Sequence, residues 1–278
     1  MTTKNTAPRT ATADAVRTEG VRAGYDNRII VDGVDIAIAR GSYTAIIGPN
    51  ACGKSTLLRT IARVLPALEG SILLDGEDIH RCPPKQLATR LGLLPQTCIA
   101  PDGIRVTDLV ARGRYPHQGM FDRWSVEDEK AVVAALEATG TVGISGRLVE
   151  ELSGGQRQRV WVAMALAQQT PILLLDEPTT FLDISHQYGL LELFETLRSQ
   201  LRRTIVVVLH DLNQAARYAS HLIVMKAGTV VASGEPAQIL TAELVEDVYG
   251  LPCIIRPDPE TGTPLIIPRR GAGRPLGG

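Results

Sequence analysis

One short segment combines glycines, a lysine and a hydroxyl residue in the spacing of a phosphate-binding loop. It runs Gly48, Pro49, Asn50, Ala51, Cys52, Gly53, Lys54 and Ser55, which fits the pattern G-x-x-x-x-G-K-[ST] of a P-loop. Glycines let backbone N–H groups approach phosphate oxygens, and a following helix adds partial positive charge at its N-terminus. The lysine can reach the β- and γ-phosphates, and the serine hydroxyl can bind Mg²⁺. Alone, the segment predicts a nucleoside triphosphate site that ATPases, GTPases and kinases share.

Two adjacent carboxylates, Asp176 and Glu177, follow the apolar run 172–175. Ligands of α/β sheets bind where strands end, so Asp176 is suited to a Mg²⁺ shell and Glu177 to polarising an attacking water. A second run, 204–209, ends in His210, which can donate a hydrogen bond to phosphate. Alone, the acidic pair could be a solvated turn after a core strand, and a lone histidine at such a place is usually structural. Together they favour hydrolysis over transfer to a substrate.

A second glycine-rich segment, Leu152, Ser153, Gly154, Gly155 and Gln156, precedes a pattern of small and apolar residues typical of a helix. It predicts another anion site at a helix N-terminus. A chain that binds one ATP needs no second site of this kind, unless that site serves the nucleotide of a partner molecule.

Short apolar runs must position these residues. Residues 43–47, 172–175 and 204–209 predict strands that lead into loops and helices, and the last two runs are continuously apolar, as in central strands covered on both faces. Residues 222–225 and 230–232 predict an antiparallel hairpin. The fold class is therefore α/β, a P-loop NTPase core with a mixed sheet that includes an antiparallel part.

The chain is predicted to form one domain, residues 16–268, between flexible tails at 1–15 and 269–278. A helical subdomain is expected at about 97–158, inserted in the α/β core. It contains helical patterns at 108–111 and 125–138, the latter with Ser125 and Asp128 in a capping-box spacing. The helix after the P-loop is expected to carry apolar residues at 57, 58, 61, 64 and 65.

Composition excludes several classes of protein. Hydrophobic residues make up 44% and charged residues 21%, which is ordinary for a globular protein and unlike a disordered one. A net charge of −1 gives no field to hold nucleic acid, so none is expected as a partner. The four cysteines have no paired spacing and predict reduced thiols. No apolar run is long enough to span a bilayer, so a membrane role must come through partners.

The ordered set of motifs resembles the nucleotide-binding subunits of ABC transporters, whose defining signature is Leu-Ser-Gly-Gly-Gln. The P-loop, an intervening glutamine at Gln96, the signature at 152–156, the Asp176 and Glu177 pair and the later His210 occur in the order typical of that family. The resemblance extends from about residue 18 to 232. It implies an ATP-hydrolysing enzyme with ATP and Mg²⁺ as its ligands.

The resemblance also implies a head-to-tail dimer of this chain, with each ATP held between the P-loop of one copy and the signature of the other. It implies catalytic roles for Glu177, His210 and Gln96, and metal binding by Ser55, Gln96 and Asp176. Nucleotide binding is implied for the P-loop and for Thr56, Ser153, Gly154, Gly155, Gln156, Asp183 and Tyr25, the last stacked on adenine. Ala51 departs from the glycine of many relatives, and its methyl would cost about 1–2 kcal/mol if the backbone there has positive φ.

Finer resemblance at residues 112–117, 178–187 and 210–215 points to the ATPases of importers for ferric siderophores, vitamin B12 and haem, with siderophores fitting best. It implies integral membrane permease subunits, an indirect extracytoplasmic substrate-binding protein, and a place on the cytoplasmic face of the cell membrane. Residues 112–117 could contact the permease or form a surface loop. A soluble ABC ATPase acting on ribosomes or DNA would share every motif, although such proteins usually have two cassettes or a coiled-coil insertion. A regulatory module without turnover would lack Glu177 or His210.

Overall fold

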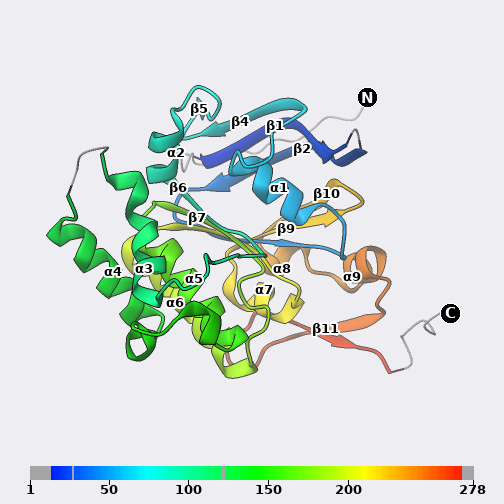
Figure 1. Ribbon diagram of the computed structural model, residues 1–278. Helices are drawn as coiled ribbons and strands as arrows, with labels where there is room; N and C mark the ends of the chain where they lie inside the picture. The colour runs from blue at the N-terminus through cyan, green and yellow to red at the C-terminus, as the bar shows by residue number, and fades with distance from the viewer. Residues whose placement is uncertain (1–13, 27, 120–122, 271–278) are drawn as a thin grey trace.

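A mainly parallel sheet forms the centre of the part of the chain that the computed structural model describes, residues 14–26, 28–119 and 123–270 (Figure 1). Its strands lie in the order β10-β9-β3-β8-β7-β6, and neighbours are parallel except β9 and β10. Their bounds are β3 Tyr43–Ile47, β6 Leu91–Leu94, β7 Ile172–Asp176, β8 Thr204–Val208, β9 His221–Lys226 and β10 Thr229–Gly234. β3, β7 and β8 are buried along their whole length, so the prediction of central strands and of a hairpin after them is confirmed.

A second, antiparallel sheet covers one side of the first. It is formed by β1 (Asp14–Tyr25), β2 (Arg28–Ala39), β4 (Glu69–Leu74) and β5 (Glu77–Asp78). Helix α1 (Lys54–Ile61) packs between the two sheets, because Leu57, Leu58 and Ile61 are buried in one apolar core with residues from both. The motifs did not predict this sheet. Bulges in β1 interrupt the alternation of buried and exposed residues by which a strand is recognised.

Helices cover the opposite face of the central sheet. α5 (Gly154–Ala167), α6 (Ile184–Leu201) and α7 (Leu212–Tyr218) pack there with α3 (Val106–Ala111) and α4 (Val126–Ala138). Side chains of β7 point alternately to the two faces of the sheet. Leu173 and Leu175 lie in the apolar core formed with these helices, and Ile172 and Leu174 lie in the core formed with α1 and the antiparallel sheet. This division explains why the strand is apolar without interruption.

The helices between β6 and β7 form a layer at one side of the molecule (Figure 1). They include the short turns η1 (Arg112–His117), η2 (Val142–Ile144) and η3 (Val149–Glu151). The predicted capping box is confirmed, because the Asp128 N–H donates to Ser125 Oγ at 3.0 Å and the Ser125 N–H donates to Asp128 Oδ2 at 3.1 Å. A buried ion pair, Arg114 Nε to Asp128 Oδ1 at 2.8 Å, ties η1 to α4.

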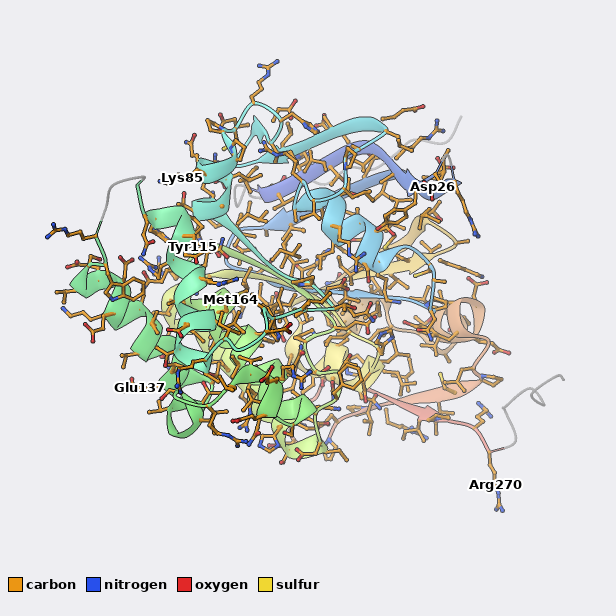
Figure 2. The ribbon with its side chains drawn as sticks, in the orientation of Figure 1. Asp26, Lys85, Tyr115, Glu137, Met164 and Arg270 are labelled. Atoms are coloured by element: carbon orange, nitrogen blue, oxygen red, sulfur yellow. The ribbon has the colours of Figure 1, made fainter. Side chains whose placement is uncertain are left out.

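The η1 turn also meets helix α2 (Pro84–Arg90) at the junction with the sheets. The Lys85 ammonium donates to the backbone carbonyl of Gln118, and α2 contacts η1; Figure 2 labels Lys85 on α2 and Tyr115 on η1. Gly113 lies so close to α5 that a Cβ there would approach Met164 O to 2.3 Å. Arg114 is buried while Tyr115 is exposed, so only part of the 112–117 segment is available to a partner.

The chain ends in α8 (Pro236–Ile239), α9 (Ala242–Tyr249) and the hairpin β11 (Cys253–Pro257) and β12 (Pro264–Pro268). The expected tails fall largely outside the described residues, except that Asp14 and Ala15 begin β1 and the Arg269 N–H donates to Pro252 O.

The predicted extent of the helix after the P-loop is wrong. α1 ends at Ile61, because Arg63 adopts positive φ and its guanidinium donates to the Ile79 and Cys82 carbonyls. Among the described residues no helix has the length and apolarity needed to cross a membrane.

Candidate nucleotide site

The P-loop lies in a cleft of about 1030 Å³ at the ends of the parallel strands. The cleft is lined by residues 48–56 and by Tyr25, Arg28, Ile30, Gln96, Glu177, His210 and Tyr249. The predicted P-loop, Thr56, Tyr25, Gln96, Glu177 and His210 therefore meet in one place, and Asp176 bonds to Ser55 beneath it. The volume is at the upper end of the range of about 300–1,000 Å³ that is typical of small-molecule and cofactor sites.

The backbone of the P-loop follows from its residue types. Gly48 and Gly53 have φ of 152° and 104°, and a Cβ on Gly48 would lie 2.2 Å from Met225 O. Ala51 has φ of 59°, so the positive φ considered for this position is present. The Lys54 ammonium is buried within the loop and donates to Gly48 O at 2.9 Å and Pro49 O at 2.8 Å. Burial raises the pKa of the neighbouring Cys52 thiol, although Lys54 opposes this shift.

Asp176 is fully buried at the end of β7, directly below the P-loop. Ser55 Oγ donates to its Oδ1 at 2.7 Å, whereas its Oδ2 has no hydrogen-bond donor among the described residues and lies 3.9 Å from Arg59 Nη2. Burial raises the pKa of Asp176, and the Ser55 hydrogen bond and the Arg59 charge only partly offset this. A buried carboxylate oxygen without a hydrogen bond, next to a hydroxyl, is suited to a hard cation.

Glu177 lies between two side chains that bind its two oxygens. Gln96 Nε2 donates to Oε2 at 2.7 Å, and His210 Nε2 lies 2.6 Å from Oε1. The sheet register brings them together, because Leu94 pairs with Leu175 and Asp176 pairs with Val208, and Gln96, Glu177 and His210 follow these pairs by one or two residues. Glu177 has φ of 52°, which turns its side chain out of the strand path. A carboxylate held in this way can orient or deprotonate a water.

The signature residues lie outside this cleft. Ser153 caps α5, since the Gln156 N–H donates to Ser153 Oγ at 3.3 Å and the Ser153 N–H donates to Gln156 Oε1 at 3.2 Å. Ser153 and Gly154 are exposed, and a Cβ on Gly154 would lie 3.6 Å from Cβ of Phe181. Phe181 itself is 80% exposed. Within the described residues, the signature thus presents its hydroxyl and backbone to solvent.

Asp183 lies on the same side as the signature, at the start of α6. Its carboxylate accepts from the His186 N–H at 3.0 Å, and this backbone hydrogen bond, followed by those from the His186 and Ser185 side chains, lowers the pKa of Asp183. Ile184 next to it is 74% exposed. Two large apolar side chains, Phe181 and Ile184, therefore flank Asp183 on an open surface, which is typical of a protein contact site.

Motif reasoning did not find three residues that line the cleft, Arg28, Ile30 and Tyr249. Tyr249 comes from the end of α9, about 200 residues after the P-loop in sequence, and no motif marks it. Burial raises the pKa of its phenol. Only the fold shows that the C-terminal part of the chain contributes to this site.

Comparison with known proteins agrees with the geometry. The ABC transporter family model matches residues 31–180. The ferric enterobactin transport ATP-binding protein FepC of Escherichia coli (strain K12) is 53% identical over 253 residues, which cover 91% of this chain and 93% of FepC.

Two solved structures extend the likeness to most of the fold. One, described as a metal-chelate type ABC transporter in an inward-facing conformation, has a TM-score of 0.79 at 27% identity and covers 93% of this chain and 98% of its own. The other is a dimeric post-hydrolysis state of the cassette MJ0796 bound to ADP and Pi, with a TM-score of 0.71 at 26% identity, covering 79% of this chain and 98% of its own.

Proposed function

This chain belongs to the ABC transporter family of ATP-binding proteins, and we propose that it is the ATP-hydrolysing subunit of an importer for ferric siderophores. The observation that carries the enzymatic part is the position of Glu177, held by Gln96 and His210 in the same cleft as the P-loop. The likeness to the ferric enterobactin protein supports the class of cargo. The cargo itself would bind other subunits.

In the proposed mechanism, the P-loop N–H groups and the N-terminus of α1 hold the phosphates of ATP. The Lys54 ammonium would exchange the Gly48 and Pro49 carbonyls for phosphate oxygens, which carry more negative charge. Tyr25, which lies at the mouth of the cleft and is 43% exposed, would stack on adenine. Glu177 would orient and deprotonate the attacking water, and His210 would hold the carboxylate and approach the γ-phosphate.

Mg²⁺ fits the residues that the site provides. Ser55 and Asp176 would hold it together with Gln96, because these are oxygen donors of the type that Mg²⁺ prefers and one Asp176 oxygen has no hydrogen-bond partner in the part of the chain that the structure describes. When bound, the ion would neutralise charge on the phosphates. Arg59, 3.9 Å from Asp176, balances part of the carboxylate charge in the structure described here.

The exposed signature supports a head-to-tail dimer. Ser153, Gly154, Gly155 and Gln156 face solvent or are half-buried, and none lines the cleft of its own chain, so they would complete the site of a second copy. Phe181, Asp183 and Ile184 lie on the same surface and would be covered by that copy. A solved relative, the cassette MJ0796 bound to ADP and Pi, is described as dimeric, which supports pairing of two copies.

ATP binding would close this dimer, and Gln96 and the helical subdomain would pass the movement to integral membrane permease subunits. The likeness to a transporter of metal chelates supports this coupling. The subunit would then be peripheral, on the cytoplasmic face of the membrane, and would meet an extracytoplasmic substrate-binding protein only through the permease.

Uptake of radioactive iron by cells tests the proposal. Cells lacking this gene should lose uptake of a ferric siderophore and regain it with the wild-type gene, but not with Glu177→Gln. Ferrous iron uptake serves as the control and should not change. Normal siderophore uptake in the deletion strain would contradict the importer assignment, while purified protein without Mg²⁺-dependent ATP hydrolysis would contradict the enzymatic one.

A further inference from the structure

The end of the chain, residues 242–268, contacts both sides of the nucleotide cleft, and we call this segment the C-terminal brace. It consists of α9, β11 and β12. In Figure 1 the orange α9 lies beside the ends of β9 and β10, and the hairpin continues below α7. The brace therefore extends from the P-loop to the helix that follows His210.

On the P-loop side, the brace is attached in two ways. Tyr249, the last residue of α9, is half-buried and lines the cleft with Gly48 and Cys52 of the P-loop. Lys226 Nζ donates to both the carbonyl and the carboxylate of Asp247 at 2.8 Å. Two residues after Lys226, the Gly228 N–H donates to Cys52 O at 3.0 Å. Helix α9 thus lies beside the loop at the cleft and is linked to it through the β9–β10 turn.

On the other side, the brace is attached to α7, which begins two residues after His210. Asn213 bonds to the edge of β12 as a neighbouring strand would, since its Oδ1 accepts from the Ile266 N–H at 2.7 Å and its Nδ2 donates to Ile266 O at 3.3 Å. Arg217 one turn later forms ion pairs with Asp258 at 3.4 Å and Glu260 at 2.7 Å. The position of α7 therefore depends on the hairpin.

The two attachments belong to one packed unit. Val245 and Val248 of α9 are buried in the same apolar core as Cys253 of β11 and Ile266 of β12, and each is at most 5% exposed. Close-packed side chains transmit displacement because the interior has little free volume. A shift of α9 at the P-loop must therefore move the hairpin, and the reverse also holds.

We propose that the C-terminal brace sets the distance between the P-loop and His210, with Tyr249 and Asn213 as its positioning residues. Tyr249 holds the first turn of the P-loop in the shape that binds phosphate. Asn213 keeps α7, and with it His210, at the distance at which the imidazole meets Glu177. This inference rests on the proposed roles of the P-loop and His210 and adds residues that the motifs do not include.

The two positioning residues act on different steps, so their variants should differ. Tyr249→Phe keeps the ring packing and removes only the hydroxyl at the wall of the cleft, so ATP should bind about 3- to 10-fold more weakly while kcat stays within twofold. Asn213→Leu keeps the volume and removes both bonds to β12, so kcat should fall about 10-fold while the Kd for ATP stays within twofold. A merely structural role would lower the melting temperature without this separation.

The experiment measures the Kd of an ATP analogue and the steady-state kcat and KM of the full chain. Tyr115→Phe, which removes the hydroxyl of an exposed tyrosine on η1, is the control for Tyr249, and Gln238→Leu, whose amide bonds only to Glu235 among the described contacts, is the control for Asn213. The brace is refuted if the wild type hydrolyses ATP and both test variants match their controls. If the wild type itself does not hydrolyse ATP, the proposed function fails instead.

Discussion

The imidazole of His210 lies 2.6 Å from one oxygen of Glu177, and the Gln96 amide donates to the other at 2.7 Å. The Glu177 side chain is 10% exposed and the His210 side chain 45%. The carboxylate is therefore oriented from both sides while the imidazole stays open toward the cleft. This arrangement suits a carboxylate that acts on a water.

Glu177→Gln should lower ATP turnover by about 10²- to 10⁴-fold and leave ATP binding intact, because an amide can keep the contacts but cannot accept a proton. Steady-state hydrolysis and equilibrium binding of ATP measure the two effects. Glu137→Gln, an exposed change on α4, is the matched control and should have wild-type turnover. Turnover of Glu177→Gln within tenfold of the wild type would refute the assigned role.

Asp176→Asn should abolish Mg²⁺-dependent hydrolysis and also stabilise the nucleotide-free protein by on the order of 1 kcal/mol at pH 7. Burial raises the pKa of Asp176, so the folded state is favoured when the carboxyl is protonated. The stability that the protonated carboxyl gives is lost as the pH rises from the pKa of Asp176 in the unfolded chain to its higher pKa in the folded protein. The neutral amide of asparagine has no such loss. Thermal melting at pH 7 without nucleotide should rise by about 2–4 °C. A lower melting temperature would contradict the prediction.

Arg114→Met should destabilise the fold by about 3–5 kcal/mol at pH 7, because Asp128 would keep a buried charge without its partner. Urea unfolding measures the loss. Arg198→Met is the control, since its pair with Glu195 is about one third exposed and should contribute at most about 1 kcal/mol. Equal losses for the two variants would show that the buried pair has no special role.

The Arg114 effect should also depend on pH in a defined direction. Burial alone would raise the pKa of Asp128, but hydrogen bonds from Arg114 and Ser125 lower it below its usual value. Stability from a carboxyl with a lowered pKa is present above the unfolded pKa of about 3.9 and is lost as the pH falls through the folded pKa. The difference in unfolding free energy between the wild type and Arg114→Met should therefore shrink below about pH 4, and a constant difference would contradict the ion pair.

Ala51→Gly should stabilise the nucleotide-free protein by about 0.5–1 kcal/mol, because relief of the methyl at positive φ exceeds the entropy that glycine adds to the unfolded chain. Ala134→Gly is the control with the opposite sign. It lies on the exposed side of α4, where glycine should destabilise by about 0.5–1 kcal/mol. Thermal unfolding of both variants tests the pair, and a loss of stability in Ala51→Gly would refute the argument.

The chemistry of the site could be predicted from sequence because each group is marked locally. The P-loop, the Asp176 and Glu177 pair and His210 all follow short strands, and parallel strands necessarily end at one edge of a sheet. The capping box at Ser125 was equally local. Their roles in catalysis stay predictions until the variants are measured.

Features that depend on contacts between distant segments could not be predicted. The antiparallel sheet was missed because bulges break the alternation in β1, and the end of α1 was misplaced because Arg63 bonds to carbonyls that arrive from residues 79 and 82. Tyr249 was missed because no motif connects α9 to the P-loop. In each case contacts between distant segments decide the local structure or the position of the residue, and the local sequence pattern carries no information on those contacts.

The separation of Ser153 from the cleft of its own chain has a genetic consequence. Under the proposed pairing, a mutant lacking Lys54 and a mutant lacking the signature damage opposite halves of each composite site. Mixed pairs of the two mutants would contain one site built only from intact halves, whereas like pairs would contain none. Cells that express both defective alleles together should therefore recover ATP hydrolysis that neither allele supports alone. An excess of either defective allele over the normal gene should impair iron uptake.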